Sequence, residues 1–139
     1  MGNITNGKPR SILVVDDNAP VVEFLRLALE QQGYHPTVRH DPVMALDWAV
    51  NAESPPDVAL VDFLMPRMTG VELARRLRER YPGLPLILVT GSIMVPDLAG
   101  LQELQPCRII QKPFRLPELL RSIESFFAPA DAIERPARG

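Results

Sequence analysis

The sequence predicts an α/β fold with five parallel strands in one doubly wound sheet and five helices on its two faces. Short apolar runs alternate five times with helical patterns along the 139 residues, and this alternation predicts a parallel sheet with right-handed crossovers. The runs are rich in Val, Ile and Leu on both faces, which is typical of strands that helices cover on both sides. Polar residues end the runs, at the edge where such sheets bind ligands.

We expect strands near residues 11–16, 35–39, 57–62, 85–90 and 107–111, and helices near residues 20–32, 42–52, 70–80, 96–104 and 116–127. Asp41 and Pro42 are an N-cap and a first-turn proline for the second helix. Gly33 is a good stop for the first. On the third helix, Arg78 is expected to face water with its arginine neighbours.

The length and composition fit one domain, which we expect to cover residues 10–127. Residues 1–9 are predicted to be a flexible N-terminal tail. Residues 128–139 are predicted to be a disordered C-terminal tail because they are rich in Pro, Ala and charge.

Composition also excludes some classes of function. The net charge of −2 argues against direct nucleic-acid binding and against binding to anionic membranes. The first ten residues lack an apolar stretch, and no run is as long as a membrane span, so neither a signal peptide nor a membrane segment is expected. Cys107, the single cysteine, lies in an apolar run, which suits a packed thiol in a reducing cytoplasm.

Reactive side chains end four of the five predicted strands: Asp16 and Asp17, Asp62, Thr90, and Lys112. Lys112 is one of two lysines among fifteen basic residues, and a lysine ammonium can reach a single phosphate oxygen. Taken singly, each residue would be read as a helix cap, a turn former or a solvated end. Their joint occurrence along one edge of a sheet favours a functional site.

The residue types indicate phosphoryl chemistry. Three neighbouring carboxylates repel one another, and a hard divalent cation such as Mg²⁺ relieves this repulsion. No His or Cys lies near these positions, so zinc is not expected. A carboxylate such as Asp62 can accept a phosphoryl group as an acyl phosphate. Lys112, Thr90 and loop amides would neutralise the charge on the transferred group.

These residues resemble the receiver domain of two-component response regulators, similar in size to the stand-alone chemotaxis type. The resemblance covers about residues 10–127 and rests on four motifs: Asp16-Asp17, the segment from Val61 to Gly70, Thr90-Gly91 and Lys112-Pro113-Phe114. It implies a flavodoxin-like strand order 2-1-3-4-5. It also implies that a histidine kinase or a phosphotransfer domain phosphorylates the chain.

The resemblance assigns a role to each site residue. Asp62 would be the phosphoacceptor, and Asp17, Asp62 and the Leu64 carbonyl would bind Mg²⁺, with Asp16 acting mainly through water. Thr90 would bond the phosphoryl oxygen. Lys112 would pair with Asp62, and the Lys112–Pro113 bond would be cis.

Two features depart from the family. Position 109, usually Tyr or Phe, is Ile109, so the aromatic half of the usual switch is missing. We expect Ile109 to stay buried in both signalling states. The helix after Thr90 begins late, at Pro96. Both changes fall on the face through which receivers usually signal.

Two other functions compete with phosphoacceptance. An aspartyl-nucleophile phosphatase needs an acid or base soon after its nucleophile, and Leu64 has no proton to give, so the chain is not expected to be an enzyme. A phosphorylation-independent binding module usually loses a site residue, and none is lost here. The sequence leaves open the kinase, the output, a possible homodimer, and whether the receiver stands alone or belongs to a larger regulator.

Overall fold

The computed structural model describes residues 4–5, 8–91 and 102–127. Its main sheet has five parallel strands in the order β4-β3-β5-β6-β7. These strands are β3 (Ser11–Val15), β4 (His35–Arg39), β5 (Val58–Asp62), β6 (Leu86–Thr90) and β7 (Cys107–Gln111). Counted along the main sheet alone, this is the expected order 2-1-3-4-5, and each strand lies within one residue of its predicted bounds.

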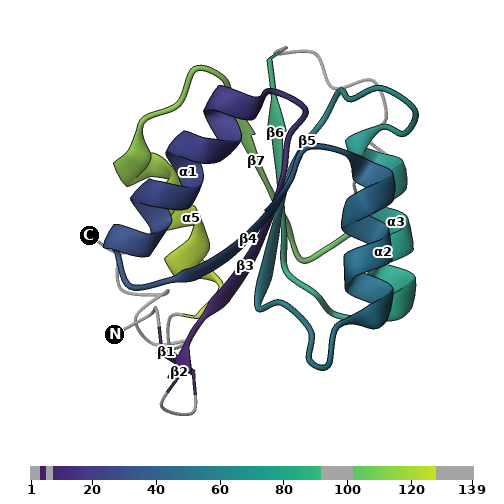
Figure 1. Cartoon of the computed structure of the whole chain (residues 1–139), viewed down its shortest axis with the longest axis horizontal. Helices are drawn as coiled ribbons and strands as arrows, with labels where there is room; N and C mark the ends of the chain where they lie inside the picture. Colours follow the sequence, from purple (N-terminus) through teal and green to yellow (C-terminus); the bar gives the residue numbers. More distant parts are fainter. Residues whose placement is uncertain (1–3, 6–7, 92–101, 128–139) are drawn as a thin grey trace.

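The four helices of the described residues lie in pairs on the two faces of the sheet, an arrangement that Figure 1 lets the reader follow. Helices α1 (Ala19–Gln31) and α5 (Leu116–Ser125) lie on one face, and α2 (Pro42–Asn51) and α3 (Gly70–Arg80) on the other. The inner strands β3, β5 and β6 are buried on both sides almost throughout, so two apolar clusters form, one under each helix pair. The doubly wound architecture predicted from the alternation of strands and helices is confirmed.

The helix expected at 96–104 falls mainly on residues 92–101, which lie outside the described residues. Gln102 and Glu103 are helical. The described residues therefore contain four helices of the five expected. None of the helices in this part of the chain is long and apolar enough to cross a membrane.

The N-terminal segment contains a short hairpin of two antiparallel strands, β1 (Ile4–Thr5) and β2 (Lys8–Pro9). The sequence predicted a flexible tail over residues 1–9. Residues 1–3 and 6–7, like the predicted tail at 128–139, lie outside the described residues, so the extent of both tails stays a prediction.

Side-chain caps begin three helices. Asn18 caps α1 by accepting from the Val21 N–H at 3.2 Å, and Thr69 caps α3 by accepting from the Glu72 N–H at 3.1 Å. Asp41 caps α2, as its sequence context predicted. These caps fix the points at which the chain leaves the carboxyl ends of the strands and enters each helix.

Arg78 corrects one expectation. Its guanidinium does not point simply into water but donates hydrogen bonds to four main-chain carbonyls: Leu84 at 2.6 Å, Leu104 at 2.7 Å, Gln105 at 2.8 Å and Pro106 at 3.2 Å. The helical pattern placed position 78 on the polar side of α3. It could not show that loops before β6 and β7 would bring carbonyls to that position.

The two edge strands differ in how they meet solvent. On β4, Pro36 has no N–H to offer a neighbouring strand, and the Arg39 guanidinium donates to the Val38 carbonyl at 2.7 Å. On β7, Ile109 is 46% exposed. The expectation that Ile109 is buried is therefore wrong, because β7 lies at the edge of the sheet.

Candidate functional site

The acidic cluster of Asp16, Asp17 and Asp62 lies at the carboxyl ends of two adjacent strands. Val15 pairs with Val61 in the β3–β5 register, so the residues that follow each strand meet at the same edge. Each carboxyl group offers an oxygen, and these oxygens lie within 4.8 Å of one another. The sheet thus brings together the three carboxylates singled out from the sequence.

Thr90 and Lys112 complete this edge. Thr90 ends β6, the strand next to β5, and its carbonyl accepts from the Lys112 N–H at 2.7 Å. The Lys112 ammonium lies 3.0 Å from Asp16 Oδ2 and 3.4 Å from Asp62 Oδ1. The expected pairing of Lys112 with Asp62 is present, and the structure adds a shorter contact with Asp16. The Lys112–Pro113 bond is cis, as expected.

Burial sets the electrostatics of the cluster. Asp16 is 4% exposed and Asp62 8%, whereas Asp17 is exposed. Burial, followed by the negative charge of Asp16, raises the pKa of Asp62 above its usual value, and the attraction of Lys112 only partly offsets this. One carboxyl of the cluster is thus less acidic than usual, through burial first and the crowding of like charges second.

Lys112 keeps its charge despite partial burial. Burial alone would lower the pKa of the Lys112 ammonium, but hydrogen bonding to Asp16 and the charges of Asp16 and Asp62 outweigh burial and raise it. At neutral pH a cation therefore faces the cluster, in a position to meet the oxygens of an incoming anionic group.

Asp16 and Asp17 are held differently. Asp16 uses one oxygen for Lys112 and the other to accept from the Asn18 N–H at 2.9 Å. Asp17 is exposed beside them. Carboxylate oxygens of this kind are the ligands that Mg²⁺ prefers, so the residues fit a hard divalent cation, with Asp17 the more available of the pair.

Gly70 lets the chain pass close to the phosphoacceptor candidate. A Cβ atom at this position would stand 2.2 Å from the Asp62 carbonyl oxygen, so only glycine fits without a shift. The Gly70 N–H donates to the Phe63 carbonyl at 2.8 Å, and the Phe63 N–H donates to the Val89 carbonyl at 2.7 Å. Sequence reasoning used Gly70 only as part of a motif and did not find this close approach.

Leu64 lies just beyond Asp62, with its side chain 67% exposed. The next residue, Met65, is buried in the apolar cluster under α2 and α3. The Leu64 side chain therefore takes no part in the core. The interest of this position lies in its main-chain carbonyl, which the sequence interpretation assigned to the metal.

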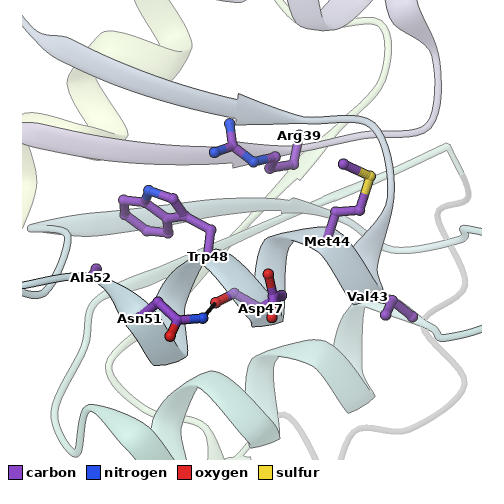
Figure 2. Close-up of a pocket in the computed structure, with 7 residues that line it drawn as sticks. All are labelled: Arg39, Val43, Met44, Asp47, Trp48, Asn51 and Ala52. Carbon is purple, nitrogen blue, oxygen red and sulfur yellow. Dashed lines mark hydrogen bonds between the residues drawn. The ribbon is translucent and has the colours of Figure 1, made fainter.

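The cavity in Figure 2 is not lined by the cluster, although the carbonyl of Arg39, one of its lining residues, accepts from the Asp16 N–H at 3.3 Å. Its volume is about 590 Å³, and it lies between β4 and α2. It is lined by Arg39, Val43, Met44, Asp47, Trp48, Asn51 and Ala52. Trp48, on α2, points toward β4 there. The cavity and the acidic cluster share no residue.

Comparison with known proteins identifies the family. A family model described as the response regulator receiver domain matches residues 12–124. The chain belongs to this family. Response regulator MprA of Mycobacterium bovis is 36% identical over 129 residues, which are 91% of this chain and 55% of that protein. The chain spans about half the length of the curated relatives it matches.

Solved receiver structures agree with the fold. Chemotaxis protein CheY4 of Vibrio cholerae matches with a TM-score of 0.76 and 25% identity, over 84% of this chain and 97% of that one. A CheX–CheY complex with BeF₃ and Mg²⁺ from Borrelia burgdorferi matches with a TM-score of 0.80 at 21% identity, over 91% and 97% of the two chains. At that identity the second match shows the fold alone.

Proposed function

We propose that Asp62 is the phosphoacceptor and that a histidine kinase or a phosphotransfer domain supplies the phosphoryl group. The observation that carries this proposal is the arrangement of three carboxylates within 4.8 Å of one another, with the Lys112 ammonium 3.4 Å from Asp62. The receiver family supports the choice of donor. The three neighbouring carboxylates, as hard oxygen ligands, support the choice of Mg²⁺.

Each residue of the edge has a role in the transfer. An Asp62 oxygen attacks phosphorus, the bond from phosphorus to the donor nitrogen breaks, and the donor imidazole leaves with the electron pair. Lys112 neutralises charge on the phosphoryl oxygens, and the Thr90 hydroxyl hydrogen-bonds to one of them. Asp17, Asp62 and the Leu64 carbonyl would hold Mg²⁺, which would supply further neutralisation, while Asp16 would act through water and orient Lys112.

The reaction ends with the phosphorylated chain rather than with turnover of outside substrates. An aspartyl-nucleophile phosphatase needs a second acid or base close to its nucleophile. Leu64 is exposed at that place and carries no titratable group. We therefore propose a phosphoacceptor that assists only its own phosphorylation and dephosphorylation, and that meets its donor in the cytoplasm.

The test is transfer from a small phosphodonor. With Mg²⁺ and acetyl phosphate, the wild-type chain should gain one phosphoryl group that base removes, and Asp62→Asn should gain none. Intact-protein mass spectrometry measures both. Equal labelling of the two proteins would show that another residue accepts the phosphoryl group, and no labelling of the wild type would support the phosphorylation-independent module instead.

A further inference from the structure

We propose that the ion pair between Arg67 and Asp41 positions the β5–α3 loop, residues 63–69, for cation binding and phosphoryl transfer. Arg67 would then be a positioning residue that touches neither the metal nor the phosphoryl group. The inference rests on the proposed function of Asp62, and it adds a contact between Arg67, within the Val61–Gly70 motif, and Asp41, which lies outside the four receiver motifs.

The backbone of Arg67 is the first reason to expect a constraint. Its φ is +74°, and among the described residues it is the one non-glycine residue with a positive φ. Side chains other than glycine, asparagine and aspartate rarely adopt this left-handed conformation. Such a conformation persists where the surroundings hold it in place, so Arg67 is expected to have an anchor.

The anchor is Asp41, the N-cap residue of α2. The Arg67 guanidinium forms an ion pair with Asp41 Oδ2. The other oxygen of Asp41 caps the helix, accepting from the Val43 N–H at 2.7 Å and the Met44 N–H at 3.3 Å. The Asp41 side chain is only 19% exposed, although that of Arg67 is 62% exposed. Arg67 is thus tied to a carboxylate that the first turn of α2 already holds in place.

The position of this tie within the loop gives it a consequence for the metal. The Phe63 N–H and carbonyl are bonded to β6 and to Gly70, which fixes the base of the loop. Met65 is buried, and Arg67 is paired with α2. The Leu64 carbonyl, the proposed metal ligand, lies between these fixed points. Loss of the Arg67 contact would let the outer part of the loop move and would reduce the time that this carbonyl spends in position.

Simple electrostatics predicts a different result, and this allows a decisive test. Removing the positive charge of Arg67 near a cation site should strengthen Mg²⁺ binding, and removing the negative charge of Asp41 should weaken it. Positioning predicts that both changes weaken binding. The double variant also distinguishes the two explanations. If the effects were electrostatic, their opposite signs would cancel and the double variant would bind Mg²⁺ like the wild type. If both substitutions remove the same contact, the double variant should bind Mg²⁺ about as weakly as either single variant.

The experiment compares Asp41→Asn, Arg67→Gln and the double variant in the full chain. Asparagine caps a helix about as well as aspartate, so α2 keeps its cap. Calorimetric titration with Mg²⁺ should give a dissociation constant about threefold higher in each of the three variants, the scale of one exposed ion pair. The initial rate of labelling by acetyl phosphate at subsaturating Mg²⁺ should fall in parallel. Arg67→Lys keeps the positive charge, so this variant should retain most of the wild-type Mg²⁺ affinity and labelling rate.

Arg76→Gln is the matched control. Arg76 is also an exposed arginine in an ion pair, with Glu72 on α3, and its loss should leave Mg²⁺ affinity unchanged. Unchanged or tighter binding in Arg67→Gln, or wild-type affinity in the double variant, would overturn the proposal. Failure of the wild type to become labelled would instead count against Asp62 as phosphoacceptor, while the metal titration would still decide the role of the pair.

Discussion

The two ends of the sheet both hold charge in partly buried surroundings, but with opposite results. At the carboxyl ends, Asp16 and Asp62 lie close together, and burial raises the pKa of Asp62. At the amino ends, the Arg78 guanidinium reaches four carbonyls around the starts of β6 and β7. The carboxylates at the first end repel one another, and a bound cation would neutralise them. At the second end the two terminal nitrogens of Arg78 are hydrogen-bonded within the chain, and among the described side chains its Nε is a buried atom without a partner.

The carboxyl end of the sheet is therefore a candidate binding site, whereas Arg78 and its four carbonyl partners at the amino end form a structural clamp. A buried charge with internal hydrogen-bond partners stabilises the fold, because removing it leaves those partners without a donor. Crowded like charges disfavour the ionised state and leave binding energy available to a cation. Substitutions at the two ends should therefore change stability in opposite directions.

The largest expected effect is at the clamp. Arg78→Ala should lower the free energy of unfolding by roughly 3 kcal/mol, because it removes the donor for several partly buried carbonyls. Urea unfolding followed by circular dichroism measures this change. Arg80→Ala is the control, since Arg80 is exposed nearby on the same helix, and it should cost less than about 1 kcal/mol. Equal effects of the two variants would mean that the clamp adds no stability.

Metal binding should stabilise the opposite end. At a Mg²⁺ concentration ten times the dissociation constant, binding to the native state alone adds about 1.4 kcal/mol to the free energy of unfolding. Asp17→Ala removes the exposed carboxylate of the cluster and should abolish most of this gain. Thermal melts with and without Mg²⁺ measure it, with Asp47→Ala on α2 as an acidic control. A gain that persists in Asp17→Ala would place the ion elsewhere.

Without metal, removing charge from the cluster should itself stabilise the protein. Asp62→Asn should raise the free energy of unfolding at neutral pH by about 1 kcal/mol, because it removes a buried charge beside Asp16 while Lys112 keeps Asp16 as its nearer partner. The sign follows from the raised pKa of Asp62. The native state then holds the proton more tightly than the unfolded state does, so wild-type stability falls as pH rises from about 4 through the native pKa.

The pH dependence provides the check on that prediction. The gain from Asp62→Asn should be near zero below about pH 4, where the carboxyl is protonated in both states, and should appear as pH rises. Chemical unfolding at several pH values, in the presence of a chelator, measures it. A gain that does not vary with pH would point to packing rather than to charge.

Local signals explain how much of the structure the sequence predicted. Strand bounds were close because buried runs end at polar residues, and α2 was placed by Asp41 and Pro42 because capping acts within one turn. The meeting of Asp16 with Asp62 follows from any parallel sheet in which β3 and β5 are neighbours. These features require no knowledge of the loops.

The missed features depend on contacts between distant segments. Arg78 lies 26 to 28 residues before three of its carbonyl partners, so helical periodicity around position 78 contains no trace of them. The pairing of Arg67 with Asp41 likewise joins two loops, and the close approach of Gly70 to Asp62 depends on the path of the β5–α3 loop. In each case the tertiary partner, and not the local pattern, determines the role of the residue.

The smallest expected effect is at Ile109, on the edge of the sheet between the two ends. A buried truncation would cost roughly 2–4 kcal/mol, but Ile109 is 46% exposed. Ile109→Ala should therefore cost about 1 kcal/mol or less, from the smaller apolar area it removes and a lower strand preference. Ile110→Ala, at the buried neighbour on β7, is the contrast and should cost at least twice as much.

Urea unfolding of both variants decides the point, and labelling by acetyl phosphate should stay near the wild-type rate in Ile109→Ala. A large cost at Ile109 would mean that another segment covers this side chain in solution, and the face around β7 would then differ from the exposed edge described above.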